Sequence, residues 1–325
     1  MKLFVYGYRP YDEAEAFTHY AEKYHVTLGL SRAQPSMENA SLAEGYDCIS
    51  IVSTPMPEQL IVRFRSLGIR MISTRTVGYD HVDLEAAKAV GIHVSNATYS
   101  PDCVADYTVM LILMALRKAK RILQRAELHD FSLPGTIGRE LRSCTVGVLG
   151  TGKIGKTVLR DLKGFGCSLM AYGRTRDPEL DVPYVSLDTL LSSCDILTMH
   201  MPLNESNYHL IDHQAIGKMK TGAVIVNTAR GGLIDTDALI EGLECGKIGA
   251  AALDVVEDEG GLFHFDRKSD QIGHRAISVL KDMPNVIFTP HMAFYTQEAI
   301  GDMVGHSVES CVLELSGKEN PWRIL

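Results

Sequence analysis

Three segments in the second half of this 325-residue chain combine residue types that could do acid–base chemistry. Arg230, an acidic run at residues 257–259 and His291 each follow a short, β-branched, apolar run. Histidine can give and take a proton near neutral pH, and the arginine fork can bind a carboxylate through two parallel hydrogen bonds. Ligands of open α/β sheets bind outside the carboxyl ends of the strands, so we expect these three segments to converge on one site.

A glycine-rich turn supplies a second candidate site. An apolar run at residues 145–149 leads into Gly150, Thr151, Gly152, Lys153, Ile154 and Gly155, and a helical pattern follows at residues 156–165. In such a turn the first glycine permits a tight bend, the second admits a pyrophosphate, and the third lets helix and strand pack closely. The pattern predicts a dinucleotide site, with the phosphates at the N-terminus of the helix.

The next predicted strand ends where the choice of cofactor is usually made. NAD sites place an acid there, which accepts hydrogen bonds from the ribose 2′-hydroxyl. This chain has Gly173, Arg174, Thr175 and Arg176 instead. A guanidinium binds a 2′-phosphate that a carboxylate would repel, so we expect NADP(H) to be preferred. The alternative is that both arginines are solvated loop residues and that NAD(H) is also used.

Short strand-like runs alternate with helical patterns along the whole chain, which predicts α/β folding with open parallel sheets covered by helices on both faces. In the first third we expect strands at residues 3–6, 48–52, 71–74 and 93–95, and helices at 12–24, 58–67 and 83–90. A second series predicts strands at 145–149, 168–172, 196–200, 224–227, 251–255 and 286–289. Six strands in this order fit one doubly wound dinucleotide-binding domain.

The sequence also predicts where the two domains meet. Ser100, Pro101 and Asp102 are typical of a helix start, and the apolar helix that follows should run to about Ala126 and contribute to a subunit interface. A last helix at residues 296–315 should return to the first domain. We therefore expect one domain at residues 1–99 and 297–325, with a cofactor domain at 100–296 inserted into it. The polar, glycine-rich stretch at 257–275 should be a loop.

Composition excludes several classes of protein. The formal charge of −8, from 32 basic and 40 acidic residues, argues against a nucleic-acid surface. No apolar run is long enough to span a membrane, and the N-terminus has the pattern of a strand rather than of a secretory signal. Seven cysteines without a C-x-x-C pair suit reduced thiols in a cytoplasmic protein. No metal-ligand pattern stands out.

Several motifs together resemble the D-isomer-specific 2-hydroxyacid dehydrogenase family. They are residues 72–78, residues 99–101, the glycine turn and the three late segments, all in family order. The similarity is closest to the D-lactate dehydrogenase branch, of the vancomycin-resistance type, through residues 99–107, 261–263 and 283–287. The resemblance implies a flavodoxin-like substrate domain and a Rossmann cofactor domain with an interdomain cleft, and a homodimer. It implies NAD(P)H-dependent reduction of a small 2-keto acid, with pyruvate favoured.

The resemblance also implies a role for individual residues. Arg230 would bind the substrate carboxylate and polarise its keto group, His291 would exchange the proton, and Glu259, rather than its neighbours Glu257 and Asp258, would orient His291. The residues implied to bind the cofactor are Gly150, Gly152, Lys153, Ile154, Gly155, Arg174, Thr175, Arg176, Pro202, Thr228, Ala229 and Asp254. The residues implied to bind the substrate are Val77, Gly78, Tyr99, Phe294 and Tyr295, with Arg9 a weaker candidate.

Two other functions remain open at this point. One is a glyoxylate or hydroxypyruvate reductase of the same family. The family also contains dinucleotide-binding corepressors, which use the same scaffold to bind other proteins, although this chain keeps the arginine, glutamate and histidine together. Turnover of 2-keto acids distinguishes the enzymes from the binding modules.

Overall fold

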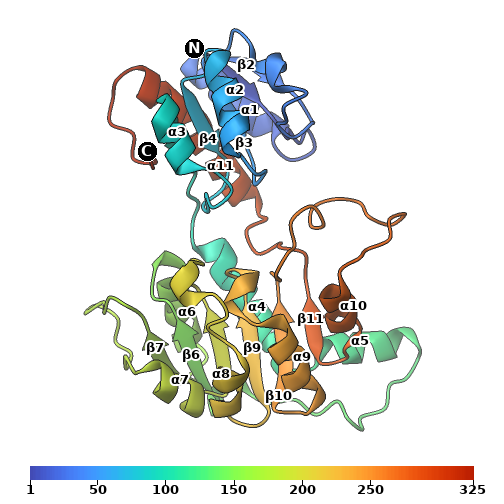
Figure 1. The fold of residues 1–325 in the computed structure, drawn as a ribbon. Coiled ribbons are helices and arrows are strands. Elements are labelled where there is room, and N and C mark those ends of the chain that lie inside the picture. The colour runs from blue at the N-terminus through green and yellow to red at the C-terminus, as the bar shows by residue number, and fades with distance from the viewer. The chain divides into compact units, whose positions relative to one another are not determined.

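The computed structural model describes residues 1–325 and divides into two compact units (Figure 1). Unit 1 combines Met1–Ser100 with Tyr295–Leu325, and unit 2 is Pro101–Phe294. Each unit is a parallel sheet covered by helices, as the alternating pattern predicts. No helix has the length and apolar character needed to cross a membrane.

Unit 1 contains five parallel strands in the order β2-β1-β3-β4-β5, which is the flavodoxin-like order that the resemblance implies. Four strands were predicted from the sequence: β1 (Lys2–Val5), β3 (Cys48–Ile51), β4 (Met71–Thr74) and β5 (His93–Ser95). The fifth, β2 (Thr27–Leu30), was missed. It lies at the edge of the sheet, is only partly buried and contains Gly29, so its apolar pattern is weak.

Helices cover both faces of this sheet. Residues of α1 (Ala14–Tyr24) and α11 (Gln297–Leu315) share a buried cluster with β1, β3 and β4. Residues of α2 (Glu58–Ser66), α3 (Leu84–Val90) and the short 3-10 helix η1 (Ala40–Ala43) bury the opposite face. The prediction that the last helix packs on the first domain is confirmed.

A buried ion pair fixes the chain just after β4. Arg75 is fully buried, and its Nε lies 3.0 Å from Oε1 of Glu13, which is 1% exposed. The same guanidinium donates to Oγ of Ser50 at 2.9 Å and to the carbonyl oxygen of Tyr6 at 3.0 Å. These partners compensate the desolvated charge and anchor the start of the loop that carries Val77 and Gly78.

Unit 2 contains six parallel strands in the order β11-β10-β9-β8-β6-β7. They are β6 (Thr145–Leu149), β7 (Ser168–Tyr172), β8 (Ile196–Met199), β9 (Ala223–Asn227), β10 (Ile248–Leu253) and β11 (Val286–Phe288). Beyond β7, Tyr184 forms a single parallel β-bridge with Ala171 of that strand, at the position that a further strand would occupy. With that bridge counted, the order by sequence is 3-2-1-4-5-6-7, and its first six positions match the dinucleotide-binding order.

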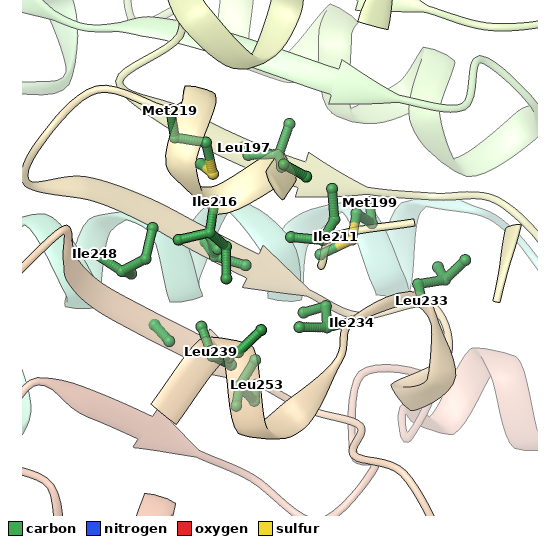
Figure 2. Close-up of a cluster of buried hydrophobic side chains, with 14 of the residues drawn as sticks. Leu197, Met199, Ile211, Ile216, Met219, Leu233, Ile234, Leu239, Ile248 and Leu253 are labelled. Atoms are coloured by element: carbon green, nitrogen blue, oxygen red, sulfur yellow. The ribbon is translucent and has the colours of Figure 1, made fainter. Parts of the chain in front are cut away.

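Two apolar layers enclose the unit 2 sheet. One contains α4 (Asp102–Leu116) and α6 (Lys153–Lys163). The other, drawn in part in Figure 2, contains α7 (Leu187–Ser193), α8 (His213–Lys218), α9 (Thr236–Glu244) and α10 (Arg275–Asp282). Three short 3-10 helices complete the unit: η2 (Leu141–Ser143), η3 (Glu205–Asn207) and η4 (Gly231–Leu233). Residues 257–274 form the expected loop.

The prediction of a single long helix from Asp102 to Ala126 is wrong. The first helix, α4, ends at Leu116, and α5 (Ala119–Glu127) begins after Lys118, whose φ of 53° lies in the left-handed region. A left-handed residue cannot continue a right-handed helix. The two helices also differ in their surroundings, because α4 buries much of its surface whereas α5 buries no residue.

The Arg75–Glu13 pair gives the first prediction. Glu13→Gln removes the charge that compensates a fully buried guanidinium, so the free energy of unfolding should fall by about 3 kcal/mol. Urea titration followed by circular dichroism measures the change. Glu22→Gln, at an exposed position of α1, the helix that follows Glu13, is the control and should change stability by less than about 0.5 kcal/mol. Equal stability of the two variants would contradict the prediction.

Candidate active site

The glycine turn follows β6 and has the geometry that each of its glycines was expected to permit. Gly150 has a φ of +92°, and a Cβ there would lie 2.5 Å from the carbonyl oxygen of His200. A Cβ on Gly155 would lie 1.9 Å from the carbonyl oxygen of Gly150, so a larger residue would separate α6 from the turn. The turn thus depends on Gly150 for its backbone conformation and on Gly155 for close packing.

Gly152 differs from the other two, because it faces open space. No heavy atom lies within 4 Å of the position that its Cβ would take. Gly152 is the N-cap of α6, and no side chain caps that helix. The next residues, Lys153 and Ile154, are exposed and half-buried. An uncapped helix N-terminus beside an open glycine is a cradle for a pyrophosphate, so the residues present fit a dinucleotide cofactor.

The segment after β7 lies next to this cradle. Gly173 is close to the glycine turn, since a Cβ on it would lie 2.8 Å from Oγ1 of Thr151. Arg174, Thr175 and Arg176 are exposed, and the Arg176 guanidinium lies 6.0 Å from the centroid of the Tyr184 ring. The structure therefore brings this predicted cofactor segment to the glycine turn.

The acidic residue next to these arginines already has a partner. Asp177 forms an ion pair with Lys156 of α6, and the hydrogen bond from Lys156 lowers the pKa of Asp177. Its main-chain amide also donates to the hydroxyl of Tyr184 at 3.1 Å. Asp177 thus stands where it can neutralise Lys156, four residues beyond the position at which an NAD-type acid was sought.

Residues after β8 and β9 complete the predicted cofactor set. Pro202 is exposed, whereas Thr228 and Ala229 are 9% exposed, and Oγ1 of Thr228 lies 2.9 Å from Oγ1 of Thr108 in α4. His200 is half-buried in the same region, and desolvation of its ring lowers its pKa to about 3. His200 is therefore neutral at physiological pH, which suits a wall of the site better than a proton donor.

Arg230 follows β9 in a turn that Asn227 closes. The buried Asn227 side chain accepts a hydrogen bond from the Ala229 amide at 3.0 Å and donates to the carbonyl oxygen of Arg230 at 2.9 Å. Arg230 itself is half-buried, and its Nη1 donates to the carbonyl oxygen of Ala229 at 2.8 Å. The turn sets the position of the guanidinium at the carboxyl end of the strand.

His291 and Glu259 form a hydrogen-bonded pair. Nδ1 of His291 lies 2.5 Å from Oε1 of Glu259, and the two side chains are 32% and 24% exposed. The other carboxylate oxygen, Oε2, accepts from the amide of Val256 at 2.9 Å. Because Nδ1 faces Glu259, Nε2 is the ring nitrogen left to exchange a proton with a ligand.

Asp254 organises the turn on which His291 stands. This fully buried residue accepts hydrogen bonds from Oγ1 of Thr289 at 2.6 Å and from the amides of Met292 and Ala293, both at 2.8 Å. Its own carbonyl oxygen accepts from the His291 amide at 2.7 Å. His291 has a φ of 54°, an uncommon conformation for a residue with a side chain. The nicotinamide contact expected of Asp254 stays a prediction.

The predicted substrate residues are divided between the two units. Phe294 lies in unit 2, where its ring centroid is 6.2 Å from that of His291. Val77, Gly78, Tyr99 and Tyr295 lie in unit 1. The amides of Val77 and Gly78 do not donate to any backbone carbonyl within that unit, as a pair of carboxylate-binding donors requires. Their placement beside His291 stays a prediction.

Tyr295 and Arg9 are linked in unit 1 through one carboxylate. The Tyr295 hydroxyl donates to Oδ2 of Asp12 at 2.8 Å, and Nε of Arg9 donates to the same oxygen at 3.0 Å. Burial and the hydrogen bond to Asp12 raise the pKa of Tyr295 to about 12. Arg9 also pairs with Glu13 at 3.2 Å, so this weaker candidate belongs to the network that includes Arg75.

Sequence reasoning missed one histidine at this site. Nε2 of His264 lies 3.0 Å from the carbonyl oxygen of His291, and its ring centroid lies 5.8 Å from that of Phe294. His264 stands in the loop between β10 and α10, where no periodic pattern fixes the position of a side chain. Its place after Gly261, Leu262 and Phe263, which are marks of the resemblance, was the only available signal.

Comparisons with known proteins agree with this geometry. Residues 109–293 match the family model described as D-isomer specific 2-hydroxyacid dehydrogenase, NAD binding domain. The chain is 44% identical over 309 residues to a D-specific alpha-keto acid dehydrogenase of Enterococcus faecium, with 95% of each chain covered. It is 43% identical over 310 residues to an aromatic 2-oxoacid reductase of Clostridium sporogenes, covering 94% of this chain and 93% of the relative.

A solved structure extends the similarity to the whole fold. A D-lactate dehydrogenase from Treponema pallidum superimposes with a TM-score of 0.90 at 32% identity, and the match covers all of both chains. The family model, the relatives and the solved structure therefore agree with a cofactor-binding domain and with a fold of two parallel sheets. The chain belongs to the D-isomer-specific 2-hydroxyacid dehydrogenase family.

Proposed function

We propose that this protein reduces a small 2-keto acid, pyruvate foremost, to the D-2-hydroxy acid, with NAD(P)H as hydride donor and His291 as acid–base group. The observation that carries the proposal is the His291–Glu259 pair beside the strand end of Arg230, on the sheet that also bears the glycine turn. β9, β10 and β11, which precede Arg230, Asp254 and His291, are neighbours in that sheet.

The bound cofactor supplies a hydride to the keto carbon. Arg230 holds the substrate carboxylate and draws electron density from the keto oxygen, because its guanidinium offers several donors in one plane. Nε2 of His291 gives its proton to that oxygen as negative charge develops there. Glu259 accepts the hydrogen bond from Nδ1, which orients the ring so that Nε2 faces the substrate. In the oxidation direction His291 takes the proton back.

Residues from unit 1 would complete the substrate site. The amides of Val77 and Gly78 would bind the carboxylate with Arg230, and Asp254 would lie near the nicotinamide carboxamide. Tyr99, Phe294 and Tyr295 would line the side-chain pocket, and their packing would decide whether 2-keto acids larger than pyruvate enter. Similarity to an aromatic 2-oxoacid reductase supports a test with large substrates as well as small ones.

For the cofactor, we propose a preference for NADP(H) within the NAD-binding family. Arg174 and Arg176 are exposed at the strand end, Gly173 replaces the acid, and Asp177 is paired with Lys156. Residues 173–177 therefore contain no unpaired negative charge that would repel a 2′-phosphate. Two guanidinium groups in the same segment can bind it.

For the assembly, we propose a homodimer formed by α5 and the loop after it. The apolar side chains there are far more exposed than is usual: Leu128 is 81% exposed, Phe131 77%, Leu133 83% and Ile137 83%. A cluster of this kind on a soluble chain marks a protein-protein contact. Seven free thiols support the cytoplasmic location expected from the sequence.

A panel of 2-keto acids tests the proposed function. With NADH and NADPH, we expect steady-state reduction of pyruvate, and chiral chromatography should show the D-enantiomer of the product. His291→Ala should lower kcat for reduction by about 10²- to 10⁴-fold, the usual contribution of a general acid, while cofactor binding measured by fluorescence persists. No turnover of any member of the panel, or near-normal turnover by the variant, would exclude this mechanism.

Kinetics with both cofactors test the preference. The wild-type protein should show a higher kcat/KM with NADPH than with NADH. Arg174→Ala combined with Arg176→Ala should lower the NADPH value by about tenfold or more, since each charge-assisted hydrogen bond contributes about 1.5–3 kcal/mol. The NADH value should stay nearly constant and serves as the internal control. A wild-type protein that favours NADH would refute the preference.

Sedimentation equilibrium tests the assembly. The wild-type protein should have the mass of two chains, and Phe131→Asp combined with Leu133→Asp should shift it to one chain, because each charge would be buried in the contact. Leu42→Asp changes an exposed leucine of unit 1 and should leave the dimer intact. A monomeric wild-type protein would show the proposal to be wrong.

A further inference from the structure

Glu257, two residues before Glu259, makes an unusual number of polar contacts for a residue in a loop. We propose that Glu257 is a positioning residue, which holds the Glu259–His291 pair in register with Arg230. The inference rests on the proposed function, because it assumes that these three residues carry the reaction. Glu257 itself does not face His291, so its effect on the reaction is indirect.

The carboxylate of Glu257 accepts four hydrogen bonds. Oε1 lies 2.6 Å from Nε2 of His209 and 3.1 Å from the hydroxyl of Tyr208. Oε2 lies 3.1 Å from the amide of Thr236 and 2.5 Å from its Oγ1. The main-chain carbonyl of Glu257 is also occupied, since Nε2 of His274 lies 2.9 Å from it. The glutamate is thus held on all of its oxygen atoms.

These contacts favour the ionised form of the Glu257 side chain. Burial opposes ionisation, but hydrogen bonds from Thr236 and His209 outweigh it, so the pKa of Glu257 is lowered. The side chain is 19% exposed, and a carboxylate in such a place needs donors on both oxygen atoms. A glutamine has nearly the same shape but would present an NH₂ group to donors.

Thr236 follows Arg230 in the chain, and the other two side-chain partners of Glu257, Tyr208 and His209, lie against the segment after Arg230. Thr236 begins α9, six residues after Arg230. His209 is hydrogen-bonded to this stretch through its own amide, which donates to the carbonyl oxygen of Gly232 at 2.8 Å. The amide of Ile211 donates to the carbonyl oxygen of Leu233 at 3.0 Å. Through these partners the carboxylate links the loop after β10 to the segment after β9.

The backbones of the same two segments, after β9 and after β10, are also closely packed. A Cβ on Gly231, the residue after Arg230, would lie 1.9 Å from the carbonyl carbon of Val256 and 2.3 Å from the amide nitrogen of Glu257. The Val256 amide in turn donates to Oε2 of Glu259 at 2.9 Å. A displacement of Glu257 therefore moves the peptide that supports Glu259, and Glu259 moves His291.

The order of the acidic run now has a physical reason. Asp258 has a φ of 53°, so the chain reverses between the two glutamates. Glu257 contacts His209 while Glu259 contacts His291. Two glutamates of one short loop thus each pair with a histidine, and the two pairs have different roles. The Glu257–His209 pair fixes the loop, and the Glu259–His291 pair contains the histidine that exchanges the proton. An arrangement that holds reacting groups to within about 1 Å can affect the rate by as much as 10²-fold.

The test uses the full-length enzyme with pyruvate and its preferred cofactor. Glu257→Gln should lower kcat by about ten- to a hundredfold, with an unchanged Kd for the reduced cofactor. The pH profile of reduction should also differ from that of the wild type, because Glu259 no longer holds His291 in the same position. His209→Gln, which keeps a side-chain donor, should retain more activity than His209→Ala.

The Glu259→Gln background separates positioning from mere folding. If Glu257 acts through Glu259, adding Glu257→Gln there should cost much less than it costs alone, and should leave the pH profile where Glu259→Gln places it. Glu241→Gln is the matched control, because Glu241 pairs with His213 at 3.0 Å on the exposed surface of the same unit. It should behave as wild type in kcat and in pH profile.

The outcomes distinguish this inference from the proposed function. Wild-type kcat and pH profile in Glu257→Gln, or full additivity with Glu259→Gln, would overturn the inference while leaving the function intact. Absence of 2-keto acid turnover by the wild-type protein would overturn the function itself. If Glu257→Gln does not fold, Thr236→Ala removes one hydrogen bond only, and a kcat and pH profile equal to wild type in that variant would refute the proposal.

Discussion

The buried carboxylate of Asp254 is the constraint on which the geometry around His291 depends. A side chain with no exposed surface must find donors for both oxygen atoms, and here they come from the turn after β11: Thr289, Met292 and Ala293. That turn carries His291 with a positive φ, a conformation that costs of order 1–3 kcal/mol and persists only where the surroundings enforce it. The last strand pair of the sheet thus holds the His291 ring in place, and Glu259 binds its Nδ1 atom.

The parallel sheet makes this possible because it delivers several chain segments to one edge. β9, β10 and β11 are adjacent, so the turns that follow them are neighbours although they are separated by more than twenty residues of sequence. Side chains then adjust each turn locally: Asn227 closes the one at Arg230, Asp254 the one at His291, and Glu257 joins the loops between them. His291 and Arg230, for which we propose acid–base and carboxylate-binding roles, are therefore fixed by the same layer of hydrogen bonds.

The sequence was sufficient for the parts of the fold that repeat a periodic pattern. Ten of the eleven strands were predicted, and the glycine turn has the expected conformation, because β-branched runs and glycine spacing are local signals. The exceptions depend on tertiary contacts. The edge strand β2 has a weak pattern, the left-handed Lys118 interrupts a run that reads as helix, and nothing local shows that Glu257 faces His209 or that His264 reaches His291. The resemblance selected Glu259 as the partner of His291, but only the folded chain shows that Glu257 meets His209.

Unit 1 is assembled from both ends of the chain, and this has a consequence for biosynthesis. Val304, Val308 and Cys311 of α11 cover an apolar face formed by Leu3, Val5, Cys48 and Met71. During translation the first hundred residues leave the ribosome with that face bare, and unit 2 has time to fold before α11 is made. The nascent N-terminal segment therefore exposes this apolar face through the interval, and unit 1 can be completed only after α11 has been made.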